Sequence, residues 1–235
     1  MPERGKARQK RSKFAKEKQS FRFPNAFDVH DAISNPLLKR VIGDNPVLYG
    51  LCGGMCFAAL DYYLADQPTP DVAQIPKADT SLYRYLRSRQ KDSMSFAVLR
   101  KLVLWMIKDD EEIARLTAQE EIPRLLRSLD SGMPMVLVMV RVGIGNPTLN
   151  HQVLAADYEY DESSRQLIIE LYDPNHPGKT PELHFDLTDP TQIRSQRQTT
   201  GEAFRGFFVT EDYNHRPPPM LIEGPPFGDN TGKYA

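Results

Sequence analysis

The 235-residue sequence predicts an α+β fold, because its helical patterns and its strand patterns occupy different parts of the chain. Between residues 53 and 129, apolar residues recur at the three- to four-residue spacing of amphipathic helices. From residue 135 onwards, the apolar segments are short, rich in β-branched residues and separated by turn sequences. Helices followed by sequential strands are typical of a mostly antiparallel sheet with helices packed against it.

The helical part contains four expected helices. The first covers Gly53–Leu64 and ends before the Asp-Gln-Pro-Thr-Pro sequence of residues 66–70. A capping-box pattern, Thr117-Ala-Gln-Glu120, predicts the start of the last helix, because its hydroxyl and carboxylate would bond the first free N–H groups. The remaining three helices are expected over Ser81–Gln90, Ser93–Lys108 and Thr117–Leu129.

The strand part begins with Met135–Val142, a continuous apolar run that is typical of a strand covered on both faces. Residues 151–160 and 165–174 flank a polar turn, Asp-Glu-Ser-Ser, and predict a β-hairpin. Another strand is expected within residues 204–213. Far upstream, the alternating aromatic residues of Phe21–Val29 predict a short strand, which Pro24 restricts to a sheet edge.

The two ends of the chain differ in composition from the residues between them, which we expect to form one domain. Residues 1–20 carry eight Lys or Arg against two Asp or Glu, and we expect a disordered basic tail because this segment cannot bury enough apolar area. Residues 21–215 form a single domain, and the Pro- and Gly-rich residues 216–235 form an extension. Nucleic acid is an expected partner only through the basic tail, for which a solubilising or targeting role is the simpler explanation.

The composition also argues against several classes of protein. About 40% of the residues are hydrophobic, but no apolar run approaches the ~20 residues of a membrane span. The N-terminus lacks the apolar stretch of a signal peptide, and two cysteines are too few for a disulfide-stapled secreted scaffold. We therefore expect a reducing compartment, the cytoplasm.

Both cysteines lie where the first helix begins, in the sequence Tyr49-Gly-Leu-Cys-Gly-Gly-Met-Cys56. Cys52 is placed at the helix N-terminus, where unpaired N–H groups and the helix dipole lower the pKa of a thiol. Gly53 and the glycine after it would let a substrate approach the backbone, and Cys56 follows one turn later on the same face.

Cys52 is therefore the candidate nucleophile, and a buried inert thiol is the alternative. A disulfide between the two cysteines would strain a helical turn, and a zinc site would need two more ligands at closer spacing.

A thiolate nucleophile needs a base, and the base needs an acceptor that orients it. His151 begins a predicted strand, and Asp173 ends the next strand of the same hairpin. Side chains alternate between the two faces of a strand, so the register of the hairpin decides whether these two groups share a face. They share one only if the hairpin has an odd-length loop or a β-bulge, and a plain two-residue loop at Glu162-Ser163 would separate them.

Four segments, taken in this order, resemble the papain-like clan of cysteine peptidases. They are Cys-Gly-Gly-Met-Cys-Phe-Ala-Ala-Leu60, Ser-Gly-Met-Pro-Met-Val-Leu-Val-Met-Val140, Asn-His-Gln-Val-Leu-Ala-Ala-Asp-Tyr-Glu-Tyr160 and Ile-Ile-Glu-Leu-Tyr-Asp-Pro-Asn175. The nearest pattern is that of the bacteriocin-processing, double-glycine-leader peptidase-like domains. The resemblance covers about residues 45–175.

The resemblance implies that Cys52 is the nucleophile, His151 the general base and acid, and Asp173 the orienting residue. It departs from the family at one point: a Gln usually stands about six residues before the nucleophile, and here that position is Pro46. Asn45 or Tyr49 is the expected substitute, together with the N–H groups of the first helical turn at Gly53, as a donor to the oxyanion.

The sequence thus predicts a cysteine hydrolase, a peptidase or amidase, that acts on a peptide or protein substrate through an acyl-enzyme. Neither a cofactor nor a metal is expected. The alternative is a catalytically inactive papain-like binding module, which the missing Gln favours, and a zinc protein is the third hypothesis.

Overall fold

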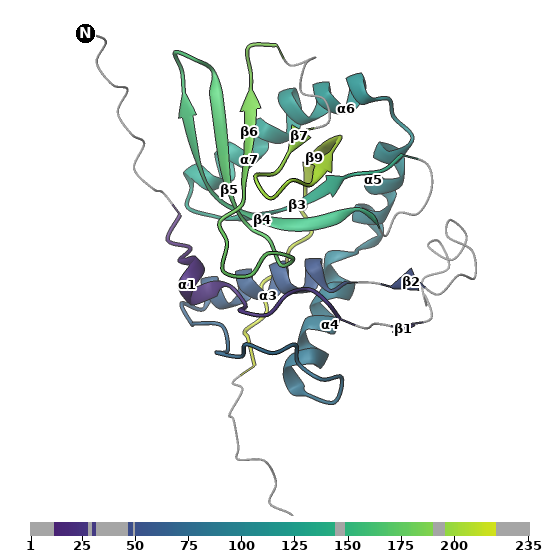
Figure 1. The fold of residues 1–235 in the computed structure, drawn as a ribbon, viewed down its shortest axis with the longest axis vertical. Coiled ribbons are helices and arrows are strands. Elements are labelled where there is room, and N and C mark those ends of the chain that lie inside the picture. Colours follow the sequence, from purple (N-terminus) through teal and green to yellow (C-terminus); the bar gives the residue numbers. More distant parts are fainter. Residues whose placement is uncertain are drawn as a thin grey trace, which may run out of the picture.

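A five-stranded antiparallel sheet forms the centre of the molecule, with strand order β6-β5-β4-β3-β9 (Figure 1). The structure is a computed structural model, and it describes residues 12–27, 30–31, 47–48, 50–143, 149–189 and 196–219. The sheet strands are β3 (Met135–Val140), β4 (His151–Asp161), β5 (Gln166–Tyr172), β6 (Glu182–Asp186) and β9 (Gly206–Val209). Two short strand pairs lie outside it: β1 (His30–Asp31) with β2 (Val47–Leu48), and β7 (Gln196–Arg197) with β8 (Ala203–Phe204).

Helices precede the sheet in the chain and pack against it, so the fold is α+β, as the sequence predicts. They are α1 (Lys16–Gln19), α3 (Cys52–Leu64), α4 (Ser81–Ser93), α5 (Phe96–Met106), α6 (Asp110–Leu116), the π-helical turn η1 (Thr117–Glu121) and α7 (Ile122–Asp130). Helix α4 begins at Ser81, as predicted, with Thr80 as its cap, but it continues to Ser93. Helix α5 begins at Phe96 rather than at the predicted Ser93, because the side chain of Ser95 caps it there.

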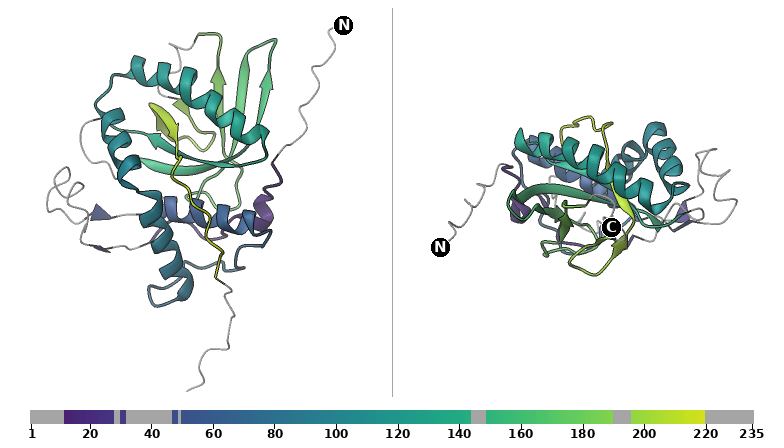
Figure 2. Two further views of the ribbon diagram at one scale, coloured as in Figure 1. Left: turned by 180° about the vertical axis from the view of Figure 1, so that it is seen from behind. Right: turned by 90° about the horizontal axis from the view of Figure 1, so that it is seen from above.

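Strand β3 is covered on both faces, which confirms the interpretation of its continuous apolar sequence. Val136 packs with helix α3, and Val138 packs with helix α5. Leu137 and Met139 point to the opposite face, where α7 closes a second core. Figure 2 shows α7 and α3 on different sides of the sheet.

Thr117 does not begin a helix, contrary to the capping-box prediction. Residues 110–130 form one continuous helical run, which Asp109 caps by accepting a 2.7 Å hydrogen bond from the Glu112 N–H. The Thr117 hydroxyl instead accepts a bond from the Phe207 N–H of β9 (3.3 Å). A capping pattern is local, and it cannot reveal that a strand from the far end of the chain competes for the same hydroxyl.

The folded part of the chain reaches further towards the N-terminus than the sequence predicts. Phe14 is 1% exposed within the core on the α3 side, although the sequence assigns residues 1–20 to a disordered tail. Phe21, Phe23 and Phe27 are buried in the same core, but residues 21–27 form no strand. Their alternation therefore reflects an irregular segment that packs its aromatic rings against α3. Residues 1–11 lie outside the described part.

After β9, residues 210–219 cross helices α3 and α4 in an extended conformation (Figure 2). Asp61 of α3 anchors this segment: it accepts hydrogen bonds from the Tyr213 hydroxyl (2.8 Å) and the Arg216 N–H (2.9 Å). The Asp61 carboxylate is fully buried and forms an ion pair with the equally buried Arg89 (2.7 Å). The extension expected from residue 216 is thus packed on the domain at its start, and residues 220–235 lie outside the described part.

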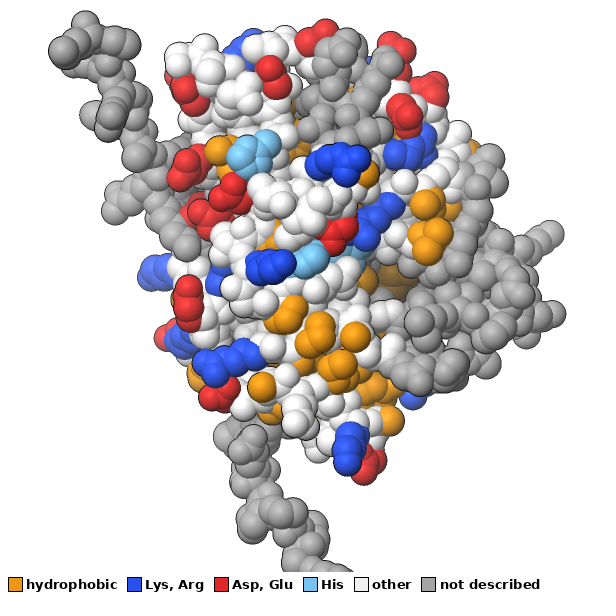
Figure 3. All heavy atoms as spheres, viewed as in Figure 1, with side chains coloured by type: hydrophobic (Ala, Val, Ile, Leu, Met, Phe, Trp, Pro, Cys, Tyr) orange, Lys and Arg blue, Asp and Glu red, His pale blue; other side chains and the backbone are white. Residues whose placement is uncertain are grey.

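Charged side chains are distributed unevenly over the surface. Exposed Asp161, Glu162 and Asp186 lie at the ends of β4, β5 and β6, where Figure 3 shows acidic side chains gathered. Within the described residues, no helix combines the length and apolarity needed to cross a bilayer.

Candidate active site

Cys52 is the first residue of α3, as predicted, and its side chain is half-buried. The residue before the helix, Leu51, has no side-chain acceptor that could cap it. Residues from other segments therefore accept hydrogen bonds from the free N–H groups at the start of the helix. Asn25 accepts a bond from the Leu51 N–H (2.5 Å), and Gln90 of α4 accepts one from the Gly54 N–H (2.7 Å). Within the described residues, the Cys52 N–H has no acceptor and is available to a ligand.

The two glycines after Cys52 are required by close packing. A Cβ on Gly53 would overlap with Gln152 Oε1 and Ser93 Oγ, and a Cβ on Gly54 would overlap with the Leu86 carbonyl. The sequence suggests that these glycines leave room for a substrate, but the space beside them is occupied by β4 and α4. Their absent side chains allow the start of α3 to lie directly against the start of β4.

A β-bulge brings His151 and Asp173 to the same face of the sheet. Asp161 pairs with Gln166, so the hairpin loop has four residues, and this register alone would place the two side chains on opposite faces. The pairing shifts by one residue between Ala155 and Asp157. The prediction of an odd-length loop or a bulge is therefore confirmed.

His151 and Asp173 form a buried hydrogen-bonded pair, with 2.7 Å between His151 Nε2 and Asp173 Oδ1. The same oxygen accepts a bond from the Asn175 N–H (2.8 Å), and Oδ2 accepts one from the Gln198 side-chain amide (2.6 Å). Burial raises the pKa of Asp173, but these donors and the charge of His151 bring it down to about 2. Asp173 is therefore an anion at neutral pH.

Burial lowers the pKa of His151, but the hydrogen bonds to Asp173 and Cys52 and the charges of both groups raise it by a larger amount, so that it lies at about 9. Burial likewise raises the pKa of the Cys52 thiol, yet the bond and charge of His151 and the N–H groups of Gln152 and Gly53 place it below its ordinary value. Both shifts favour a thiolate–imidazolium pair. Since Nε2 of His151 faces Asp173, Nδ1 is the ring nitrogen left for the thiol.

Cys56 is fully buried one turn further along α3, and its thiol donates to the Gln152 carbonyl (3.6 Å). Burial, reinforced by the charges of Cys52 and Asp173, holds the pKa of Cys56 well above its ordinary value. The two thiols therefore differ as the sequence suggests: Cys52 is exposed to a cavity and acidic, whereas Cys56 packs behind it.

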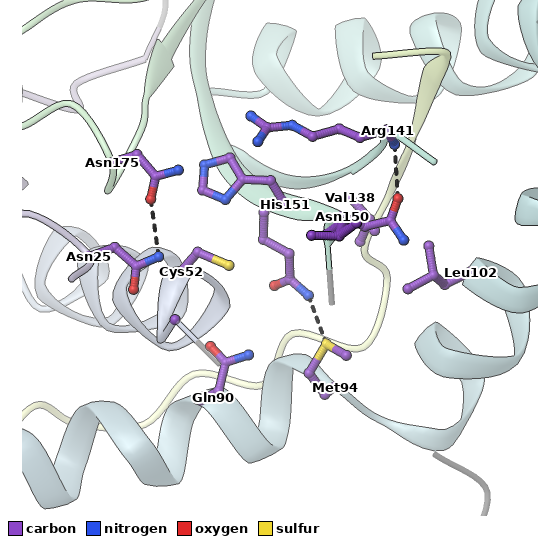
Figure 4. A pocket seen from close by; sticks show the side chains of 13 residues that line it. Asn25, Cys52, Gln90, Met94, Leu102, Val138, Arg141, Asn150, His151 and Asn175 are labelled. Atoms are coloured by element: carbon purple, nitrogen blue, oxygen red, sulfur yellow. Dashed lines mark hydrogen bonds between the residues drawn. The ribbon is translucent and has the colours of Figure 1, made fainter. Parts of the chain in front are cut away.

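A cavity of about 310 Å³ opens in front of Cys52 and His151 (Figure 4). Its described lining residues are Asn25, Gly50, Cys52, Gln90, Met94, Leu102, Val138, Arg141, Leu149, Asn150, His151, Gln152 and Asn175.

Of the residues predicted for the oxyanion, Asn45 and Tyr49 lie outside the described part of the chain. Asn25, which the sequence does not single out, lies beside Cys52 instead (Figure 4). Its Oδ1 holds the Leu51 N–H, and its Nδ2 donates to Asn175 Oδ1 (3.1 Å). No spacing rule points to Asn25, because it precedes the cysteine by a long stretch of chain; only its position next to Pro24 in a turn-like sequence is distinctive.

One group among the described residues has the proximity needed for a metal site: Asp173, His176 and Glu202. Both oxygens of Asp173 already accept hydrogen bonds from protein donors, and His176 is bonded to Glu202. Asp173 is thus served by His151, Asn175 and Gln198, and His176 and Glu202 are bonded to each other, so protein contacts account for all three side chains without a metal.

Comparisons of the chain with protein-family models, with curated proteins and with solved structures found no match. What the site can do is therefore judged from its own geometry and chemistry.

Proposed function

We propose that the protein is a cysteine hydrolase, a peptidase or amidase of papain-like type, with Cys52 as nucleophile. The observation that carries this proposal is that Cys52 and His151 line the same cavity and that His151 is bonded to the buried Asp173. A nucleophile, a base beside it and a group that orients the base are the parts that acyl transfer needs. The order of these parts along the chain supports the resemblance to papain-like peptidases.

In this mechanism the Cys52 thiolate attacks a carbonyl carbon, and the carbonyl oxygen becomes an oxyanion. The Cys52 N–H and one Nδ2 proton of Asn25 would receive the oxyanion, so that Asn25 takes the role expected for the missing Gln. The imidazolium of His151 then gives its proton to the leaving amine. A water molecule, deprotonated by His151, attacks the thioester and releases the acid, which restores the thiolate–imidazolium pair.

Acylation by p-nitrophenyl acetate tests the proposal without a known substrate. Attack by Cys52 forms an acetyl thioester and releases p-nitrophenolate, which is followed by absorbance, while intact mass reports the acetyl adduct. We expect a burst of one equivalent followed by steady turnover. Cys52→Ser should abolish the burst, whereas Cys56→Ser, the matched control, should retain it because Cys56 is buried behind the site.

The same experiment separates the enzyme from the alternative, an inactive papain-like binding module. A stable adduct on Cys52 with no steady phase would indicate a module that cannot complete hydrolysis. No faster reaction at Cys52 than at Cys56 would contradict the nucleophile itself.

A further inference from the structure

Arg141 brings a positive charge into the cavity. It directly follows β3, and its backbone N–H donates to Asn150 Oδ1 (2.8 Å), which fixes the start of its side chain at the cavity wall. Apart from the Cys52–His151 pair, it is the one ionisable side chain among the described lining residues, and none of these is Asp or Glu. Figure 4 shows its side chain reaching from the Asn150 end of the cavity towards the side of the His151 ring.

The guanidinium of Arg141 has no acceptor among the described residues. Its Nε is hidden from solvent and makes no hydrogen bond, and no carboxylate of the described chain forms an ion pair with it. Two other arginines with little exposed surface do have carboxylate partners: Arg89 pairs with Asp61, and Arg205 pairs with Asp110. Because a partly buried cation without a partner is costly, an unpaired arginine in a cavity points to an anion supplied by a ligand.

Two of the neutral side chains that line the cavity offer hydrogen-bond donors to a ligand. The Oδ1 of Asn175 is occupied by Asn25 and the Oε1 of Gln90 is occupied by the Gly54 N–H. The amide N–H groups of Asn175 and Gln90 therefore remain for a ligand within the described part of the chain. A planar guanidinium fork with amide donors nearby suits the two oxygens of a carboxylate.

We propose that this cavity binds a carboxylate of the substrate through Arg141, so that the preferred substrates are short acidic amides or peptides. The inference rests on the proposed function and names its substrate class. A volume of about 310 Å³ is at the low end of ligand cavities, which favours a short occupant with its carboxylate near the scissile carbonyl. That carboxylate is either a chain terminus or an Asp or Glu side chain.

The test compares alkylating probes that differ only in charge, in a Cys56→Ser background. N-iodoacetylglycine carries a terminal carboxylate, and N-iodoacetylglycinamide is its neutral analogue. A further iodoacetyl probe, derived from aspartic acid, carries a side-chain carboxylate. For the side-chain carboxylate, the aspartic acid derivative used is the α-monoamide, N-iodoacetyl-aspartic acid α-amide, and its neutral analogue is N-iodoacetyl-asparagine α-amide. In each case the Cys52 thiolate forms a bond to the methylene carbon and iodide leaves. Labelling rates are measured by intact mass at low and high salt.

We expect an acidic probe to react about tenfold faster than the neutral one, and whichever acidic probe is faster identifies the source of the carboxylate. Arg141→Gln should reduce the ratio of acidic to neutral rates to near one. Arg141→Glu should reverse the ratio, and salt should weaken the preference. Arg127→Gln is the matched control, since Arg127 is exposed on α7 at the other side of the sheet.

A ratio in Arg141→Gln equal to that of the unmodified protein would overturn the inference while leaving the nucleophile intact. A large fall in the neutral rate would also overturn it, because Arg141 would then act on the thiolate rather than on the ligand. Failure of the proposed function has a different signature: no probe would distinguish Cys52 from an ordinary thiol.

Discussion

Replacing Asp173 by Asn should uncouple the candidate triad while preserving its shape. The two side chains have the same size, and Oδ1 of the amide can keep the bonds from His151 and the Asn175 N–H. At the other atom the new NH₂ would face the amide of Gln198, but Gln198 Oε1 is buried without a partner, so rotation of that amide provides an acceptor. The substitution therefore removes the charge of Asp173, together with the bond from the Gln198 amide to Thr200 Oγ1.

The magnitude follows from the pKa of His151, which lies at about 9 rather than 6.5, a rise of about 2.5 units. At about 1.4 kcal/mol per unit, this corresponds to roughly 3 kcal/mol in favour of the imidazolium, shared between Asp173 and the Cys52 thiolate. We expect Asp173→Asn to lower the pKa of His151 by at least one unit. The pKa of Cys52 should rise at the same time, because a less stable imidazolium supports the thiolate less.

The assay is an NMR titration of the His151 ring together with thiolate absorbance in a Cys56→Ser background. Asp186→Asn, which neutralises an exposed carboxylate at the end of β6, is the matched control. A His151 pKa that moves by less than half a unit in Asp173→Asn, or that moves equally in the control, would refute the reasoning.

The same variant has a signature in stability. The raised pKa of His151 contributes stability that is fully present below pH 6.5 and is lost as the pH rises through about 9. The depressed pKa of Asp173 contributes stability that is present above pH 3.8 and is lost as the pH falls to about 2. The difference in unfolding free energy between the unmodified protein and Asp173→Asn should therefore be largest between about pH 4 and 6.5, and should shrink on either side.

Two other substitutions test features outside the triad. Asn25→Asp keeps the acceptor for the Leu51 N–H but removes the amide donor, so acylation by p-nitrophenyl acetate should slow by about 100-fold or more relative to alkylation by iodoacetamide, which forms no oxyanion; equal effects on both rates would contradict an oxyanion role. Asp61→Asn removes the fully buried carboxylate that pairs with Arg89 and leaves Arg89 only its more exposed partner Asp92, so it should cost about 3 kcal/mol in urea unfolding. Asp71→Asn, which breaks an exposed pair with Arg22, should cost less than about 1 kcal/mol; similar losses would show that the buried pair does not anchor the C-terminal segment.

Local patterns in the sequence were sufficient for the α+β class and for the position of Cys52. Helical spacing depends on contacts a few residues apart, which a sequence displays directly. The interpretation of Thr117 and of the aromatic segment Phe21–Phe27 failed because their partners, β9 and α3, are distant in the chain. Local rules rank what a segment can do alone, and tertiary packing selects among those options.

The candidate site divides along the same line. The sequence by itself determined that a cysteine would begin a helix, that a histidine would begin one strand of a hairpin and that an aspartate would end the next. It also showed that the histidine and the aspartate could share a face only with an odd-length loop or a β-bulge. Only the tertiary structure decided that condition, through a one-residue bulge beyond Ala155, and only the packing of distant segments placed Asn25 and Arg141 at the cavity. The physical reason is that strand register and cavity walls arise from pairings between separated parts of the chain, which periodicity does not encode.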